Sequence, residues 1–152
     1  MHRLVLSLAV TIGLTGHGAS SRSAPPMQAD FSGTWAVVSG KPIDDGSPVG
    51  TVEVITQNPG TITFSAGNRA ITYRLDGLET PDATSNRRVS KTQWISGALL
   101  VLTKTTGSNG GSWESSVIWT RHAEGELTAY QIVPITAPDG AMATSLLTYH
   151  RR

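Results

Sequence analysis

From Phe31 onward, the chain alternates between short runs rich in apolar residues and short polar breaks. The runs are heavy in Val, Ile, Thr, Tyr and Trp, which suit a pleated sheet, and the breaks contain Gly, Asn, Asp and Pro, which form turns. Within 69–75, apolar side chains recur at every second position, so they fall on one face of an extended strand. The pattern predicts nine strands, namely Gly33–Ser39, Val49–Thr56, Gly60–Ala66, Arg69–Leu75, Arg87–Ile95, Ala98–Thr105, Ser112–Arg121, Glu126–Val133 and Met142–His150.

The links between these strands are short, and several contain glycine in tight-turn positions. Short links make strands that are neighbours in sequence pair in antiparallel fashion. No segment after the N-terminal region keeps a 3.6-residue apolar period over three turns, so almost no helix is expected. Because closing a long run of strands removes exposed edges, the sequence predicts an antiparallel up-and-down barrel of about eight to ten strands, with a two-sheet sandwich as the alternative.

The N-terminal segment has the features of a secretory signal peptide. A short basic start, Met1-His2-Arg3, precedes the almost wholly apolar run Leu4–Leu14, and small residues follow it. This run is shorter than the roughly 20 residues that span a bilayer, so a retained membrane anchor is the weaker interpretation. We therefore expect cleavage near Gly18 or Ser20, and an exported protein, periplasmic or extracellular, that is not inserted in the membrane.

The rest of the chain divides into a tether and a single domain. Residues 21–30 are rich in Ser, Ala and Pro and have no apolar period, which predicts a flexible tether after a signal peptide at 1–20. Residues 31–152 form the expected barrel domain, and the length leaves no room for a second core of normal size.

Charge and cysteine content exclude several classes of function. The chain has 12 Lys plus Arg against 11 Asp plus Glu, so it lacks the positive field that gathers nucleic acid or an anionic membrane. Removal of Arg3 with the leader leaves 11 charges of each sign, which makes the mature domain nearly neutral. Since the chain has no cysteine, it forms no disulfide, thiolate metal site or lipid-modified N-terminus.

Candidate catalytic and metal-binding residues are few. After the leader the histidines are His122 and His150, and no Gly-Xaa-Ser-Xaa-Gly or phosphate-binding glycine motif is present. Asp44 and Asp45 lie in a link rich in Pro and Gly, where turn hydrogen bonding is their ordinary role, and they lack the regular spacing of calcium ligands. We therefore expect no enzyme, metal or cofactor. The one enzymatic hypothesis left open is acid–base chemistry by a buried His150 beside a carboxylate.

Aromatic residues on strand faces are the strongest sign of a binding function. Trp113 and Trp119 share one face of a predicted strand and lie about 20 Å apart at about 3.3 Å per residue, which is near the height of a small barrel. The expected ligand-binding residues are Tyr73, Gln93, Trp113, Trp119 and Tyr149, with Gln131 as a second polar anchor. Their character predicts a small, mostly apolar ligand. The alternative is that these side chains fill the barrel and that the domain is a non-enzymatic interaction module of the envelope or the secreted fraction.

The motif Gly33-Thr34-Trp35 begins the first predicted strand. Gly33 permits a sharp bend or a close approach, and Trp35 brings a large apolar group to one face, so together they would plug one end of a closed sheet. The motif resembles the Gly-Xaa-Trp start of the calycin barrels, the group of lipocalins and fatty-acid-binding proteins, and the chain looks most like small exported bacterial lipocalin-like domains. The resemblance implies that Arg151 packs over Trp35 in a structural cation–π contact.

Two features depart from the fatty-acid-binding barrels of that group. Those barrels carry a helical lid between their first two strands, whereas the link Lys41–Pro48 is short and interrupted by Pro and Gly, so no lid is expected. They also hold a carboxylate with an Arg-Xaa-Tyr triplet on the last strand, and the matching positions here are Leu147, Thr148 and Tyr149. The missing Arg argues against the carriage of fatty acids.

Overall fold

The computed structural model describes residues 28–43, 47–83, 85–134 and 141–152. These residues form ten strands and one short 3₁₀ turn, Ala123–Gly125. The strands are β1 (Gly33–Ser39), β2 (Val52–Asn58), β3 (Thr61–Ala66), β4 (Arg69–Arg74), β5 (Thr80–Asp82), β6 (Ser85–Ile95), β7 (Ala98–Thr106), β8 (Ser112–Arg121), β9 (Glu126–Pro134) and β10 (Met142–Arg151). The expected signal peptide, most of the tether and the pair Asp44-Asp45 lie outside the described residues.

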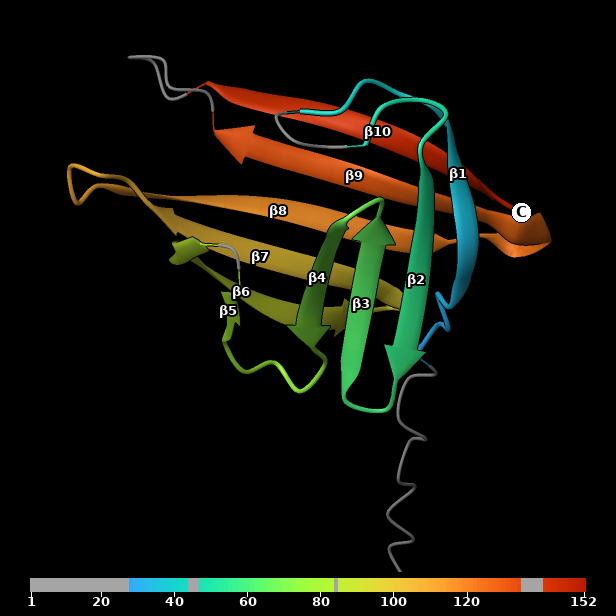
Figure 1. Ribbon diagram of the computed structural model, residues 1–152, viewed down its shortest axis with the longest axis horizontal. Helices are drawn as coiled ribbons and strands as arrows, with labels where there is room; N and C mark the ends of the chain where they lie inside the picture. The colour runs from blue at the N-terminus through green and yellow to red at the C-terminus, as the bar shows by residue number, and fades with distance from the viewer. Residues whose placement is uncertain (1–27, 44–46, 84, 135–140) are drawn as a thin grey trace, which may run out of the picture.

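All ten strands belong to one antiparallel sheet with the order β4-β3-β2-β1-β10-β9-β8-β7-β6-β5. Figure 1 shows how this sheet curls, so that β2, β3 and β4 run across the front of β7, β8 and β9. The two halves meet through side chains, because the rings of Phe64 on β3 and Trp119 on β8 have centroids 4.5 Å apart. The all-β barrel predicted from the sequence is confirmed, and the sandwich alternative is wrong because a single sheet contains every strand.

The barrel is nearly closed, and its seam lies between β4 and the hairpin β5–β6. These strands are the two ends of the sheet order, so no main-chain ladder joins them. Side-chain hydroxyls connect them instead: Thr92 on β6 donates to the carbonyl oxygen of Arg74 (2.5 Å), and the main-chain N–H of Arg74 donates to the hydroxyl of Thr80 (3.0 Å). The seam is therefore fastened by individual hydrogen bonds.

Nine of the ten strands match the predicted segments, with boundaries that differ by up to three residues. The unpredicted strand is β5, which has three residues and contains Pro81. A segment this short shows no alternation, and proline is depleted in strands, so the pattern carried no signal for it. Within the described residues, no helical lid is present between β1 and β2, and no helix is long and apolar enough to cross a membrane.

The base of the barrel is closed by Trp35, which is fully buried. Its indole N–H donates to the carbonyl oxygen of Phe31 at 2.9 Å. The guanidinium carbon of Arg151 lies 5.9 Å from the centroid of the Trp35 ring, the contact that the calycin resemblance implies. Gly33 makes room for it: φ is +148°, and a Cβ there would lie 3.3 Å from both the Trp35 Nε1 and the Arg151 Nε. The three residues form one closely packed unit.

Substitution of Gly33 by alanine tests this packing. We expect Gly33→Ala to lower the free energy of unfolding by about 1–3 kcal/mol, because an alanine is strained at this φ and its methyl group displaces the Arg151 side chain. The matched control is Gly60→Ala, where a Cβ would meet open space and φ is not positive. Urea denaturation followed by tryptophan emission measures both variants. Equal effects of the two substitutions would contradict the proposed role of Gly33.

Candidate ligand-binding site

The interior of the barrel contains two adjoining cavities, which we call the smaller lobe and the larger lobe. Their volumes are about 220 and 300 Å³. The lobes are neighbours because five residues line both of them, namely Ile71, Tyr73, Thr103, Val117 and Gln131. Side chains therefore do not completely fill the described interior, and this counts against the alternative of a solidly filled barrel.

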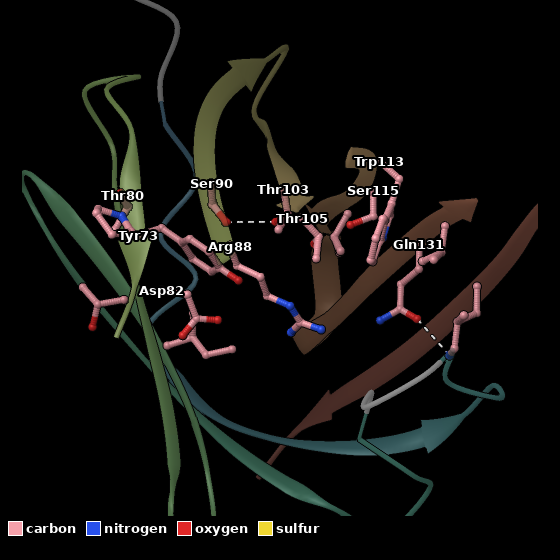
Figure 2. A pocket seen from close by; sticks show the side chains of 16 residues that line it. Tyr73, Thr80, Asp82, Arg88, Ser90, Thr103, Thr105, Trp113, Ser115 and Gln131 are labelled. Carbon is pink, nitrogen blue, oxygen red and sulfur yellow. Dashed lines mark hydrogen bonds between the residues drawn. The ribbon is translucent and has the colours of Figure 1, made fainter. Parts of the chain in front are cut away.

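The smaller lobe lies behind the seam and is rich in hydroxyl groups. Figure 2 shows Arg88 extending from β6 toward the middle of this lobe, with Asp82 and Tyr73 on one side and Trp113 on the other. Hydrogen bonds hold its walls in place, since the hydroxyls of Ser90 and Thr103 lie 2.9 Å apart. The lobe thus combines two aromatic rings with charged and hydroxyl groups.

The amide of Gln131 holds the link after β1 against the same lobe. Its Oε1 accepts a hydrogen bond from the main-chain N–H of Ile43 at 3.3 Å, which Figure 2 marks with a dashed line. Both residues line the smaller lobe, and Gln131 also lines the larger one. Gln131 therefore has a structural partner in addition to its place on the cavity wall.

The larger lobe is walled by aromatic rings and by one buried carboxyl group. The ring of Trp119 lies between Phe64, with centroids 4.5 Å apart, and Tyr149, with centroids 5.5 Å apart. Glu53 projects into the same lobe from β2 and is 7% exposed. Its carboxyl group is hydrogen-bonded by the hydroxyls of Ser47 and Tyr149. An acidic group is thus enclosed among aromatic and aliphatic side chains.

Burial governs the ionisation of this lobe. It raises the pKa of Glu53 above its ordinary value, and the hydrogen bonds from Ser47 and Tyr149 only partly offset the increase. The pKa of Tyr149 is also raised, first by burial and then by the neighbouring charge of Glu53. Burial likewise raises the pKa of Tyr73 to about 12, with Asp82 acting in the same direction and Arg88 opposing it. Both tyrosines therefore remain neutral hydrogen-bonding groups at physiological pH.

The structure brings together four of the five residues that the sequence predicts to bind a ligand. Trp113 lines the smaller lobe, Trp119 and Tyr149 line the larger lobe, and Tyr73 lines both. Gln93 lies elsewhere: it is exposed on the outer face of β6, while its neighbours Thr92 and Trp94 turn inward. The prediction that Gln93 points into the barrel is wrong, because side chains along a strand alternate between faces. Ligand binding by the other four stays a prediction.

Sequence reasoning missed four charged residues that line the cavity, namely Glu53, Arg69, Asp82 and Arg88. Glu53 had a weak signal, because it lies two residues before Ile55 and therefore on the same face of β2, and Ile55 is buried. Asp82 belongs to the short strand that the pattern did not reveal. Arg88 lies on the same face of β6 as Ser90 and Thr92. Because these residues are polar, the sequence does not indicate that this face turns into the barrel.

His150, the residue on which the acid–base hypothesis rests, lies outside the cavity. Its side chain is 60% exposed, and its Nε2 is 3.7 Å from the Glu126 Oε2. The buried histidine and carboxylate that the hypothesis requires are not formed at this position. Among the described residues, no group of three or more His, Asp or Glu side chains is placed to hold a metal ion.

Comparisons with known proteins identify the fold. No family model matches the sequence, and no curated protein matches it. Among solved structures, two point mutants of the fluorescent protein UnaG are similar, each with a TM-score of 0.53. One is 20% identical and the alignment covers 80% of this chain and 96% of that one, and the other is 19% identical with 80% and 95% covered. These similarities support a β-barrel and concern the fold alone.

The raised pKa of Glu53 makes stability depend on pH. Between the ordinary glutamate pKa and the higher pKa in the folded state, the folded chain binds more protons than the unfolded chain, so Glu53 lowers the free energy of unfolding as pH rises. We expect the Glu53→Gln variant to gain on the order of 1 kcal/mol relative to the wild type between pH 4 and pH 8. Urea denaturation at both pH values measures this difference. The exposed residue Glu114 provides the control Glu114→Gln, and a Glu53→Gln effect that is independent of pH would refute the expectation.

Proposed function

We propose that the barrel binds one small, mostly apolar molecule in its interior. The observation that carries the proposal is the pair of adjoining lobes, which share five wall residues and therefore offer one elongated space. Small barrels either fill their interior with side chains or hold a single small ligand, and this interior is hollow. The wall of the larger lobe supplies apolar contact through Phe64, Val101 and Trp119.

The arrangement of polar groups supports specific binding over mere packing space. Ligand sites are typically apolar cavities of about 300–1,000 Å³ with a few polar groups that fix the orientation of the ligand. Here the polar groups are concentrated at the smaller lobe and at Glu53, and aromatic rings line both lobes. A molecule in this space would bury its apolar body against the rings and satisfy the polar groups at its ends.

We further propose that the protein is exported before it binds its ligand. The support is the N-terminal sequence, in which the basic start and the apolar run Leu4–Leu14 have the lengths of a signal peptide. The absence of cysteine does not conflict with export, because a fold held by its buried core does not require disulfides. The ligand would then be a molecule met outside the cytoplasm.

A neutral apolar probe tests the binding function. We expect N-phenyl-1-naphthylamine to gain emission on binding, and the Val117→Phe variant to bind it about tenfold more weakly, since Val117 lines both lobes and a larger ring occupies the shared space. The matched control is Ile118→Phe, which adds the same ring at the next position, opposite Tyr130 and Leu100 on the outer face. Fluorescence titration gives both affinities.

Two results of that titration would contradict a binding cavity. One is the absence of any saturable probe emission with the wild-type protein. The other is an equal loss of affinity in both phenylalanine variants, which would place the probe outside the barrel. Overpacking at Val117 costs about 1–3 kcal/mol of stability, so circular dichroism is recorded first. If Val117→Phe is unfolded, the Val117→Ile variant, which adds one methylene group at the same position shared by both lobes and should weaken binding to a smaller extent, replaces it.

Expression of the full chain in a Gram-negative bacterium tests export. We expect the protein in the periplasmic or extracellular fraction with a new N-terminus near Gly18 or Ser20, because the small residues there suit signal peptidase. Cell fractionation followed by N-terminal mass spectrometry measures this. A Leu6→Arg substitution in the apolar run serves as the control and should retain the uncleaved chain in the cytoplasm. Uncleaved wild-type protein in the cytoplasm would disprove export.

A further inference from the structure

Glu53 departs from the usual pattern of a barrel strand. It points inward and is 7% exposed, whereas the adjacent Val54 points outward and is 46% exposed. A sheet with one face in water ordinarily buries its apolar side chains and exposes its charged ones. A shift of β2 by one residue would correct both positions, but the ladders to β1 and β3 fix the observed register. The fold therefore holds a carboxyl group inside at the cost of an exposed valine.

The carboxyl group of Glu53 retains acceptor capacity toward the larger lobe. Its hydrogen-bonding partners, Ser47 and Tyr149, contribute neutral hydroxyl groups. A carboxylate has about four lone-pair sites, so two hydroxyl donors leave further sites unoccupied. Burial outweighs these donors and raises the pKa of Glu53, which shows that the negative charge is only partly compensated. A group of opposite charge bound in the lobe would supply what the hydroxyls do not.

The surfaces beside Glu53 suit an organic cation with an apolar body. Trp119 and Tyr149 lie next to each other at 5.5 Å, and Phe64 lies 4.5 Å from Trp119. Aromatic faces attract cations and also provide the apolar area that a hydrocarbon body buries. An acidic acceptor next to aromatic faces is the combination that recognises a protonated amine.

Each lobe of the interior also carries an arginine. Arg69 lines the larger lobe from β4 and is largely exposed, and Arg88 lines the smaller lobe together with Asp82. All four charged groups affect the pKa of Tyr73. Asp82 and Glu53 raise it, whereas Arg88 and Arg69 lower it. Each lobe therefore carries one carboxyl group and one arginine, and in the larger lobe Glu53 is enclosed whereas Arg69 is largely exposed.

We propose, building on the proposed ligand-binding function, that the ligand is a hydrophobic amine whose protonated amino group donates to the carboxylate of Glu53 beside Tyr149. Its apolar body packs against Phe64 and Trp119 in the larger lobe. The hydroxyl of Tyr149 orients the carboxylate, so Tyr149 is a positioning residue for this interaction as well as part of the wall.

A series of three compounds with the same rings tests the head group. These are 1-naphthylmethylamine, which is protonated at pH 7, 1-methylnaphthalene, which has no polar group, and 1-naphthoate, which is negatively charged. We expect the wild-type protein to bind the amine about tenfold or more tightly than the methyl compound, because a buried charge-assisted hydrogen bond forms in one complex and not in the other. Isothermal titration calorimetry at constant salt gives the three affinities.

The Glu53→Gln variant tests whether Glu53 is the source of the preference for the amine. It should lose the preference for the amine over 1-methylnaphthalene, while the control Glu114→Gln, with the same change of net charge on an exposed strand position, should keep it. The Tyr149→Phe variant should retain only part of the preference, because the carboxylate loses one orienting hydrogen bond.

Each outcome decides between the two proposals. Equal binding of the amine and the methyl compound, or a preference that survives Glu53→Gln, overturns the amine proposal and leaves the apolar ligand in place. Tighter binding of the naphthoate overturns it in favour of an anion held by the arginines. Failure of all three compounds to bind overturns the binding function itself. The wild-type comparison stands without the variants, so a folding defect in any of them does not prevent a decision.

Discussion

The pairing of β1 with β10 is the constraint on which the rest of the barrel depends. It sets Trp35 opposite Arg151 and so joins the two ends of the described chain. The other edge of β1 carries β2, so the unit β2–β4 is connected to β5–β10 through main-chain ladders by β1 alone. The close packing of Gly33, Trp35 and Arg151 therefore fixes how the two halves of the sheet face each other, and with it the width of the cavity between them.

The interior is more polar than stability alone would favour. Ser90 and Thr103 hydrogen-bond each other, Thr92 bonds the carbonyl of Arg74, and Gln131 bonds the main chain of Ile43. Such pairs remove the penalty of burying a polar group without the gain that a packed leucine would provide. A wall made this way keeps its shape while it remains hollow. The buried carboxyl group of Glu53 extends the same arrangement to a charge, which is costly to enclose and useful mainly when something binds it.

The sequence predicted the architecture well because strand and turn composition is a local property. Alternation located nine strands, and the short links dictated their antiparallel order. The site was harder, since it depends on which face of each strand turns inward. In β6, the inner face carries the polar residues Ser90 and Thr92, whereas the outer face carries Val89. The hydrophobic pattern of this strand therefore did not identify its inner face. Gln93 was misplaced for this reason, and Glu53 was missed because Val54 beside it is the more hydrophobic residue. The closure of the barrel determines whether Gln93 and Glu53 face inward or outward, and no local sequence pattern encodes that closure.

The seam between β4 and β6 is also the part of the barrel wall that is least firmly connected. Elsewhere around the wall, several main-chain bonds must break together before two strands separate, whereas here the hydroxyls of Thr92 and Thr80 make the connection, each worth about 1 kcal/mol. Local opening is cheapest where the fewest bonds are lost. Thr80 also lines the smaller lobe directly behind the seam. Two threonine side chains thus determine how readily the wall opens beside the smaller lobe.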